Sequence, residues 1–155
     1  MTGRDDLVRR ALERIAKSND PSELRKVAEN AKRADNAAVQ EAALRRLYEV
    51  SPAAHAGTLE HAVWRSIHAL EDALTEERGK TTRLARTRQK IAREGEAKTV
   101  ADLVSKSASD GYRMLMERGW PELTFEFVAL QHPDSFEPHV LEAAKVRLSD
   151  SGVQV

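Results

Sequence analysis

The sequence contains no cysteine, and this absence excludes several kinds of site at once. Disulfides, thiolate nucleophiles and zinc sites built from cysteine all need that side chain. Aromatic residues make up only 5% of the chain, which is typical of amphipathic helices rather than of a β-sandwich or barrel. A chain without cysteine also fits a reducing compartment, so we expect a cytoplasmic protein.

Long apolar runs and a charge of one sign are missing too. No stretch approaches the roughly 18 apolar residues of a membrane span, and the charged N-terminal segment lacks the apolar core of a signal peptide. The 25 Lys and Arg residues balance the 25 Asp and Glu residues, which argues against a histone-like protein that coats nucleic acid by overall charge. We therefore expect a soluble protein with no membrane contact, in which any basic surface is local.

Apolar residues recur at helical spacing along the chain and predict an all-α fold of seven or eight helices. Residues 1–52 are predicted to form three short helices, with Asp20 and Pro21 at the start of the second and Glu23 placed for a capping box. Residues 57–155 are predicted to form a long central hairpin followed by C-terminal helices. Together the two sub-units make a single all-helical domain, residues 1–155.

Two segments of the chain resemble each other. Residues 39–47 are VQEAALRRL and residues 140–148 are VLEAAKVRL, and each segment would be the second helix of a hairpin. Such repetition is typical of helices stacked as antiparallel hairpins, as in a HEAT-like solenoid. An Ala- and Glu-rich composition produces similar strings without any duplication, so both explanations stay open.

Positive charge is concentrated in GKTTRLARTRQKIAREGEAK, residues 79–98, where two of the glycines bracket a predicted helix over residues 80–93. On such a helix one arc of about 80° would hold Arg83, Arg86, Lys90 and Arg93, with Thr82 and Gln89 near its edge. Like charges four residues apart weaken an isolated helix, so an opposite charge must face this arc.

Three kinds of partner could supply that opposite charge. Arginine forks bind phosphate oxygens of nucleic acid, and threonine and glutamine add neutral donors. An acidic protein surface would suit the same side chains. The chain's own carboxylates are the third source, because an antiparallel return would bring Lys80 and Arg83 next to the acids that end the preceding helix, Glu71, Asp72, Glu76 and Glu77.

We predict a non-enzymatic nucleic-acid-binding accessory or regulatory protein. The predicted contact residues are Lys80, Thr82, Arg83, Arg86, Gln89, Lys90 and Arg93. Lys98 and Arg88 would extend the same surface, although Arg88 points nearer the apolar side of the helix. The alternative is a helical protein–protein interaction adaptor that uses this basic face or its solenoid surface. A continuous basic groove would favour nucleic acid, and interleaved charge would favour the adaptor. The sequence does not decide between DNA and RNA, nor the oligomeric state.

Other motifs give little support for catalysis or for a cofactor. The string Gly79-Lys80-Thr81 matches the end of a P-loop, but Leu74 stands where its first glycine is required. His68 and Asp72 could supply only two ligands to a metal, and a packed histidine is the preferred interpretation. No nucleophile elbow or paired acid–base motif is present, so a hydrolase or nuclease ranks third and no cofactor is predicted.

Overall fold

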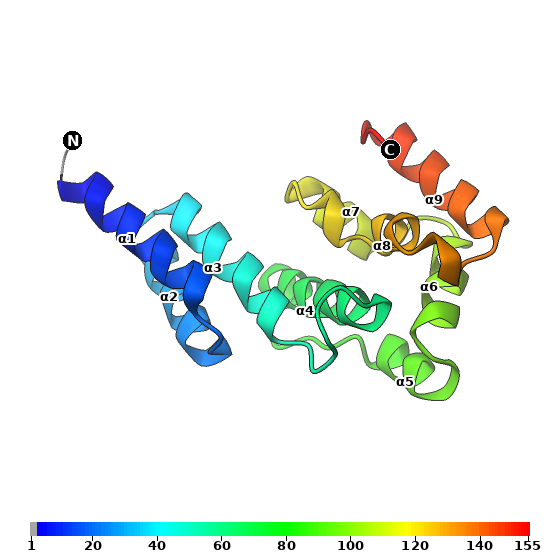
Figure 1. The fold of residues 1–155 in the computed structure, drawn as a ribbon, viewed down its shortest axis with the longest axis horizontal. Coiled ribbons are helices and arrows are strands. Elements are labelled where there is room, and N and C mark those ends of the chain that lie inside the picture. The colour runs from blue at the N-terminus through cyan, green and yellow to red at the C-terminus, as the bar shows by residue number, and fades with distance from the viewer. Residues whose placement is uncertain (1–2) are drawn as a thin grey trace. The chain divides into compact units, whose positions relative to one another are not determined.

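The computed structural model describes residues 3–155, and its regular elements are all helical (Figure 1). Nine α-helices and two short 3₁₀ turns follow one another, and no strand occurs in the described range. The all-α prediction is therefore confirmed, with one helix more than the larger number expected. The chain divides into two compact units, Met1–Ala53 and Ala54–Val155, which we call unit 1 and unit 2.

Unit 1 contains three helices, α1 (Gly3–Lys17), α2 (Pro21–Arg33) and α3 (Ala37–Val50). Both α1 and α2 pack against α3, and the buried core includes Ile15, Leu24, Ala28, Val39, Ala43, Leu47 and Tyr48. The carboxylate of Asp20 caps α2 by accepting the Ser22 N–H at 3.0 Å. The predicted capping box does not form, because Glu23 accepts hydrogen bonds from the side chains of Arg14 and Ser18 instead.

Unit 2 is built around the long helix α4 (Leu59–Arg78). Thr58 caps its start by accepting the His61 N–H at 3.2 Å, and Gly79 follows its end with φ of +71°, a left-handed conformation that glycine adopts without strain. The remaining elements are α5 (Ala85–Glu94), α6 (Glu96–Val104), α7 (Asp110–Glu117), η1 (Pro121–Leu123), α8 (Phe125–Gln131), η2 (Pro133–Ser135) and α9 (Pro138–Asp150). Helix α4 packs against α6, α7 and α8.

The packing of unit 2 differs from the expected stack of hairpins. Helix α6 contacts α4, α5, α8 and α9, whereas a solenoid repeat contacts only its neighbours along the stack. A HEAT-like solenoid is therefore not confirmed. The predicted long central hairpin does not form either, because α5 is short and packs mainly against α6.

The two similar segments lie in α3 and α9, and each is the second helix of a packed pair. Their matched apolar residues, Val39 with Val140 and Leu47 with Leu148, are all buried. The first helices differ, since residues 121–123 form a 3₁₀ turn and α8 begins only at Phe125, after its cap Thr124. The common burial agrees with a duplication, which stays a prediction.

Candidate functional site

The basic stretch begins as an extended segment rather than as a helix. The chain returns along α4 after Gly79, and two donors of its backbone bond to α4 side chains: the Thr82 N–H to Thr75 Oγ1 and the Leu84 N–H to Glu71 Oε2, each at 2.9 Å. In a helix that began at residue 80 the Leu84 N–H would bond to the Lys80 carbonyl, so its bond to Glu71 is incompatible with that helix, and α5 starts only at Ala85. The predicted helix over residues 80–93 is therefore wrong for residues 80–84.

Three of the predicted contact residues therefore lie outside the helix. Lys80, Thr82 and Arg83 precede α5, so Arg83 does not share a helical arc with Arg86. The Thr82 hydroxyl donates to the Lys80 carbonyl at 2.9 Å and is already used within the segment.

Arg88 is an internal anchor and not part of an external basic surface, contrary to the prediction. Its Nε and Nη2 atoms donate to the two oxygens of Glu71, both at 2.7 Å, and its guanidinium carbon lies 5.1 Å from the centroid of the Trp64 ring. Trp64 in turn donates from Nε1 to Glu96 at 3.2 Å. This bidentate pair, stacked on an aromatic ring, ties α5 to α4.

The surroundings of Glu71 keep it ionised. Burial alone would raise its pKa, but the hydrogen bonds from Arg88 and from the Leu84 N–H outweigh burial and lower the pKa below its usual range. The pKa of Arg88 is raised by the same hydrogen bond to Glu71. Nearby His68 has its pKa lowered, chiefly by burial, so its neutral form is favoured. The ionised pair of Glu71 and Arg88 thus holds the extended segment against α4.

Lys90, at the centre of the predicted cationic arc, is also paired inside the chain. Its ammonium lies 2.6 Å from Glu94 and 2.7 Å from Asp102, and Lys98 lies 3.0 Å from the other oxygen of Asp102. Hydrogen bonds from Lys90 and Lys98 lower the pKa of Asp102 to about 2. The prediction that Lys90 and Lys98 face an outside anion is therefore replaced by an ion-pair cluster that links α5 to α6.

Four cations of the stretch are exposed and also lack a hydrogen-bonding or ion-pairing partner among residues 3–155. They are Lys80, Arg83, Arg86 and Arg93. Gln89 is exposed as well. Arg86 and Arg93 are seven residues apart on α5, which puts them on one face about 10 Å apart along the helix axis. These residues are the part of the predicted site that is open to a partner.

Two of the acids at the end of α4, Glu76 and Glu77, do not pair as expected. Glu76 lies 3.2 Å from Arg118, and Glu77 lies 3.6 Å from Arg113, so both bind α7 or the residue after it rather than Lys80 or Arg83. The acids that neutralise the basic stretch are Glu71, Glu94 and Asp102. Sequence reasoning could have found two of these pairs, because Lys90–Glu94 and Lys98–Asp102 have the (i, i+4) spacing of helix ion pairs.

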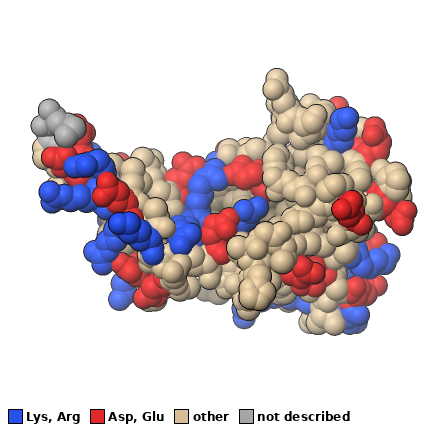
Figure 2. Space-filling model, in the orientation of Figure 1, with Lys and Arg blue, Asp and Glu red and all other residues tan. Residues whose placement is uncertain are grey.

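Positive and negative side chains are interleaved in unit 2. On the face drawn in Figure 2, the charged side chains of unit 2 are scattered among other residues, with blue and red both present, and they do not form one continuous basic patch. Unit 2 as a whole also holds more Asp and Glu than Lys and Arg residues. A phosphate backbone approaching α5 would meet carboxylates as well as arginines.

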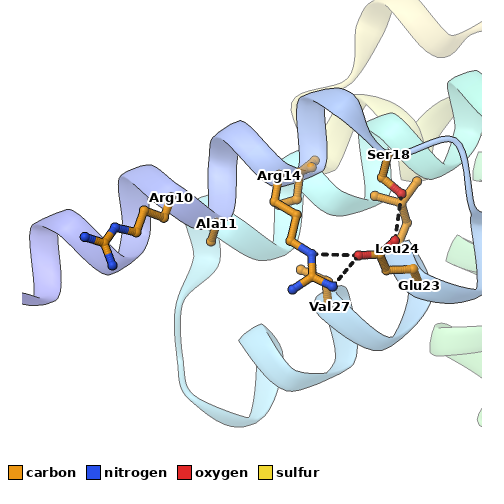
Figure 3. A pocket seen from close by; sticks show the side chains of 8 residues that line it. Arg10, Ala11, Arg14, Ser18, Glu23, Leu24 and Val27 are labelled. Carbon is orange, nitrogen blue, oxygen red and sulfur yellow. Dashed lines mark hydrogen bonds and ion pairs between the residues drawn. The ribbon is translucent and has the colours of Figure 1, made fainter.

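Unit 1 has a groove between α1 and α2, with a cavity of about 230 Å³ (Figure 3). Its apolar lining is Ala11, Ile15, Leu24 and Val27. Arg14 reaches across to Glu23 at 2.7 Å, whereas Arg10 extends away from the other side chains drawn and pairs with no residue of the range 3–155. Leu7, one helical turn before Ala11, is 65% exposed.

No cluster of three or more His, Cys, Asp or Glu side chains among residues 3–155 is arranged to hold a metal ion. None of the helices described has the length and apolar character needed to cross a membrane. Comparisons of the chain with protein-family models, with curated proteins and with solved structures find no match.

Proposed function

We propose that this protein is a non-enzymatic interaction adaptor that binds a partner protein through the exposed residues of its basic segment 80–93. The observation that supports this proposal is the interleaving of charge: free Arg86 and Arg93 lie on the same helix as the internally paired Lys90 and Glu94. A protein surface can offer acids to the free arginines and other groups to the paired ones. A phosphate backbone offers negative charge alone.

The α1–α2 groove is a second surface with similar chemistry. Its apolar floor and the unpaired Arg10 suit a partner segment that carries both apolar and acidic side chains. Arginine is enriched among residues that dominate interface energy, so Arg10, Arg86 and Arg93 are the residues most open to test.

Site-specific photocrosslinking tests this proposal. A photoreactive amino acid replaces Gln89, and matched chains carry it at Arg10 or at Lys145, an exposed residue of α9 that serves as control. After irradiation in cells of the source organism, we expect one discrete adduct from position 89 that is resistant to nuclease and absent from position 145. The double variant Arg86→Glu, Arg93→Glu should abolish it. The protein identified in the adduct is then purified, and its direct binding is compared between wild type and the double variant. A nuclease-sensitive adduct, or none from position 89, would overturn the adaptor proposal.

Nucleic-acid binding is the second candidate, because Arg86 and Arg93 are unpaired on one face of α5 and Lys80 and Arg83 are exposed just before it. If all four cations neutralise phosphates, the log–log slope of affinity against salt should be about −3 to −4. Fluorescence anisotropy with a labelled duplex and a labelled single strand at two salt concentrations measures this slope. The double variant Arg86→Glu, Arg93→Glu should flatten it. A wild-type protein that retains neither probe at low ionic strength would eliminate this candidate.

A further inference from the structure

Unit 2 also contains a cleft of about 450 Å³, and its lining does not include Arg86 or Arg93, the exposed arginines of α5. It lies between α4, the extended segment, the connection from α6 to α7 and the start of α8. Its floor and walls are largely apolar and include Leu70, Leu74, Leu84, Leu103, Tyr112 and Phe125. Small-molecule sites are typically concave, mainly apolar and of a few hundred Å³.

The charged side chains that line this cleft differ in whether they have a partner. Both acids of the lining have a cation beside them: Asp110 lies 3.9 Å from Arg113, and the buried Glu126 pairs with Arg147. The two cations of the lining, Arg78 and Lys106, are exposed, and their side chains bond to no residue of the described chain. The cleft therefore presents two uncompensated positive charges beside an apolar floor.

Contacts between α9 and residues of the lining hold the walls of the cleft in place. Arg147 donates to the Lys106 carbonyl and lies over the Tyr112 ring, and the Tyr112 hydroxyl donates to the Arg147 carbonyl at 3.1 Å. At Gly111 a Cβ atom would lie 2.7 Å from Leu70 Cδ2, so the missing side chain lets α7 start close to α4. A site formed before its ligand arrives avoids much of the entropy cost of binding.

We propose that this cleft binds a small amphipathic anion, a molecule with one carboxylate or phosphate head group on an apolar chain. Arg78 and Lys106 contact the head group, because guanidinium and ammonium groups are the natural donors to either anion. The apolar chain lies along Leu74, Leu84 and Leu103. This inference does not depend on the adaptor function, which uses Arg86 and Arg93 outside the cleft lining.

Isothermal titration calorimetry with decanoate and decyl phosphate, below the concentrations at which they form micelles, tests the site. We expect both anions to bind, with the neutral decanol and the cationic decyltrimethylammonium at least about tenfold weaker. The double variant Arg78→Ala, Lys106→Ala should weaken anion binding by at least about tenfold. The double variant Arg83→Ala, Arg86→Ala makes the same change of charge outside the lining and should bind as wild type does.

A second variant fills the cleft without touching its charges. Ala108 lies in the lining and is exposed in the α6–α7 connection, so Ala108→Trp is expected to fold and to block the anion. Circular dichroism confirms the fold of each variant. Equal binding of decanol, unchanged binding by the Arg78 and Lys106 variant, or no binding of either anion to the folded wild type would each overturn the proposal.

Discussion

Replacing Glu71 with glutamine removes the charge that Arg88 and the Leu84 N–H share. Glutamine has nearly the same shape but keeps only one acceptor oxygen, so it cannot accept the three hydrogen bonds that Glu71 accepts at 2.7, 2.7 and 2.9 Å. Leu84 and Arg88 would then lose their common anchor on α4. We expect the extended segment 80–84 to loosen and unit 2 to become less stable.

The size of the effect follows from the burial of the pair. Removing one partner of a fully buried ion pair costs about 3–5 kcal/mol, because the other charge is left uncompensated. The Arg88 side chain is 25% exposed and can recover part of its hydration. We therefore expect Glu71→Gln to lower the free energy of unfolding by about 2–3 kcal/mol.

Urea denaturation followed by tryptophan fluorescence measures this change in unit 2. Both tryptophans of the chain, Trp64 and Trp120, belong to that unit, and Trp64 lies against Arg88. The control is Glu76→Gln, because Glu76 is 54% exposed in its pair with Arg118 and such pairs contribute about 0–1 kcal/mol. A loss in Glu71→Gln no larger than in Glu76→Gln would refute the argument.

The stabilities of the wild type and of Glu71→Gln can also be compared as a function of pH. The folded-state pKa of Glu71 lies below its ordinary value of 4.5, so its stabilising effect is complete above that pH and is lost as the pH falls through the folded-state pKa. Protonated Glu71 resembles glutamine, so the difference in stability between wild type and Glu71→Gln should shrink in that acid range. A difference that stays constant there would show that its charge does not hold the segment.

Three further predictions concern other parts of unit 2. In Asp102→Asn, Lys90 keeps only its pair with Glu94, so the raised pKa of the Lys90 ammonium should fall towards its ordinary value in an NMR titration, and an unchanged pKa would mean that Asp102 does not pair with Lys90. In the wild type the Asp102 carboxyl should titrate near pH 2 by NMR. The His68 imidazole should titrate below 6.5 because it is partly buried, and its contribution to stability should therefore decline as the pH falls through that pKa; a midpoint above 6.5 would contradict the packing around it. Leu148→Ala, at a wholly buried position, should cost about 2–5 kcal/mol in urea denaturation, whereas Val146→Ala on the exposed side of the same helix should cost less than about 0.5 kcal/mol.

Local signals in the sequence located some helix boundaries correctly. Asp20 was expected at the start of the second helix and Gly79 at a helix boundary, and each lies there through a hydrogen bond or a backbone conformation within its own few residues. The all-α class follows from the same kind of information, because the 3.6-residue spacing of apolar residues is a local pattern. The long hairpin and the HEAT-like stack were not confirmed, because they depend on which helix packs against which, and local patterns do not contain that information.

The sequence by itself determined that the protein is helical and that residues 79–98 are rich in cations. Only the tertiary structure decided which of those cations are free. Arg88 bonds to Glu71 across 17 positions of sequence and the Leu84 N–H across 13, so these partners meet only after the chain has turned at Gly79 and run back along α4. Ion pairing depends on distances of a few ångströms between side chains, and charge counts along the sequence carry no such distances. For that reason Lys90 and Arg86, alike as basic residues of one helix, have opposite surroundings in the folded protein.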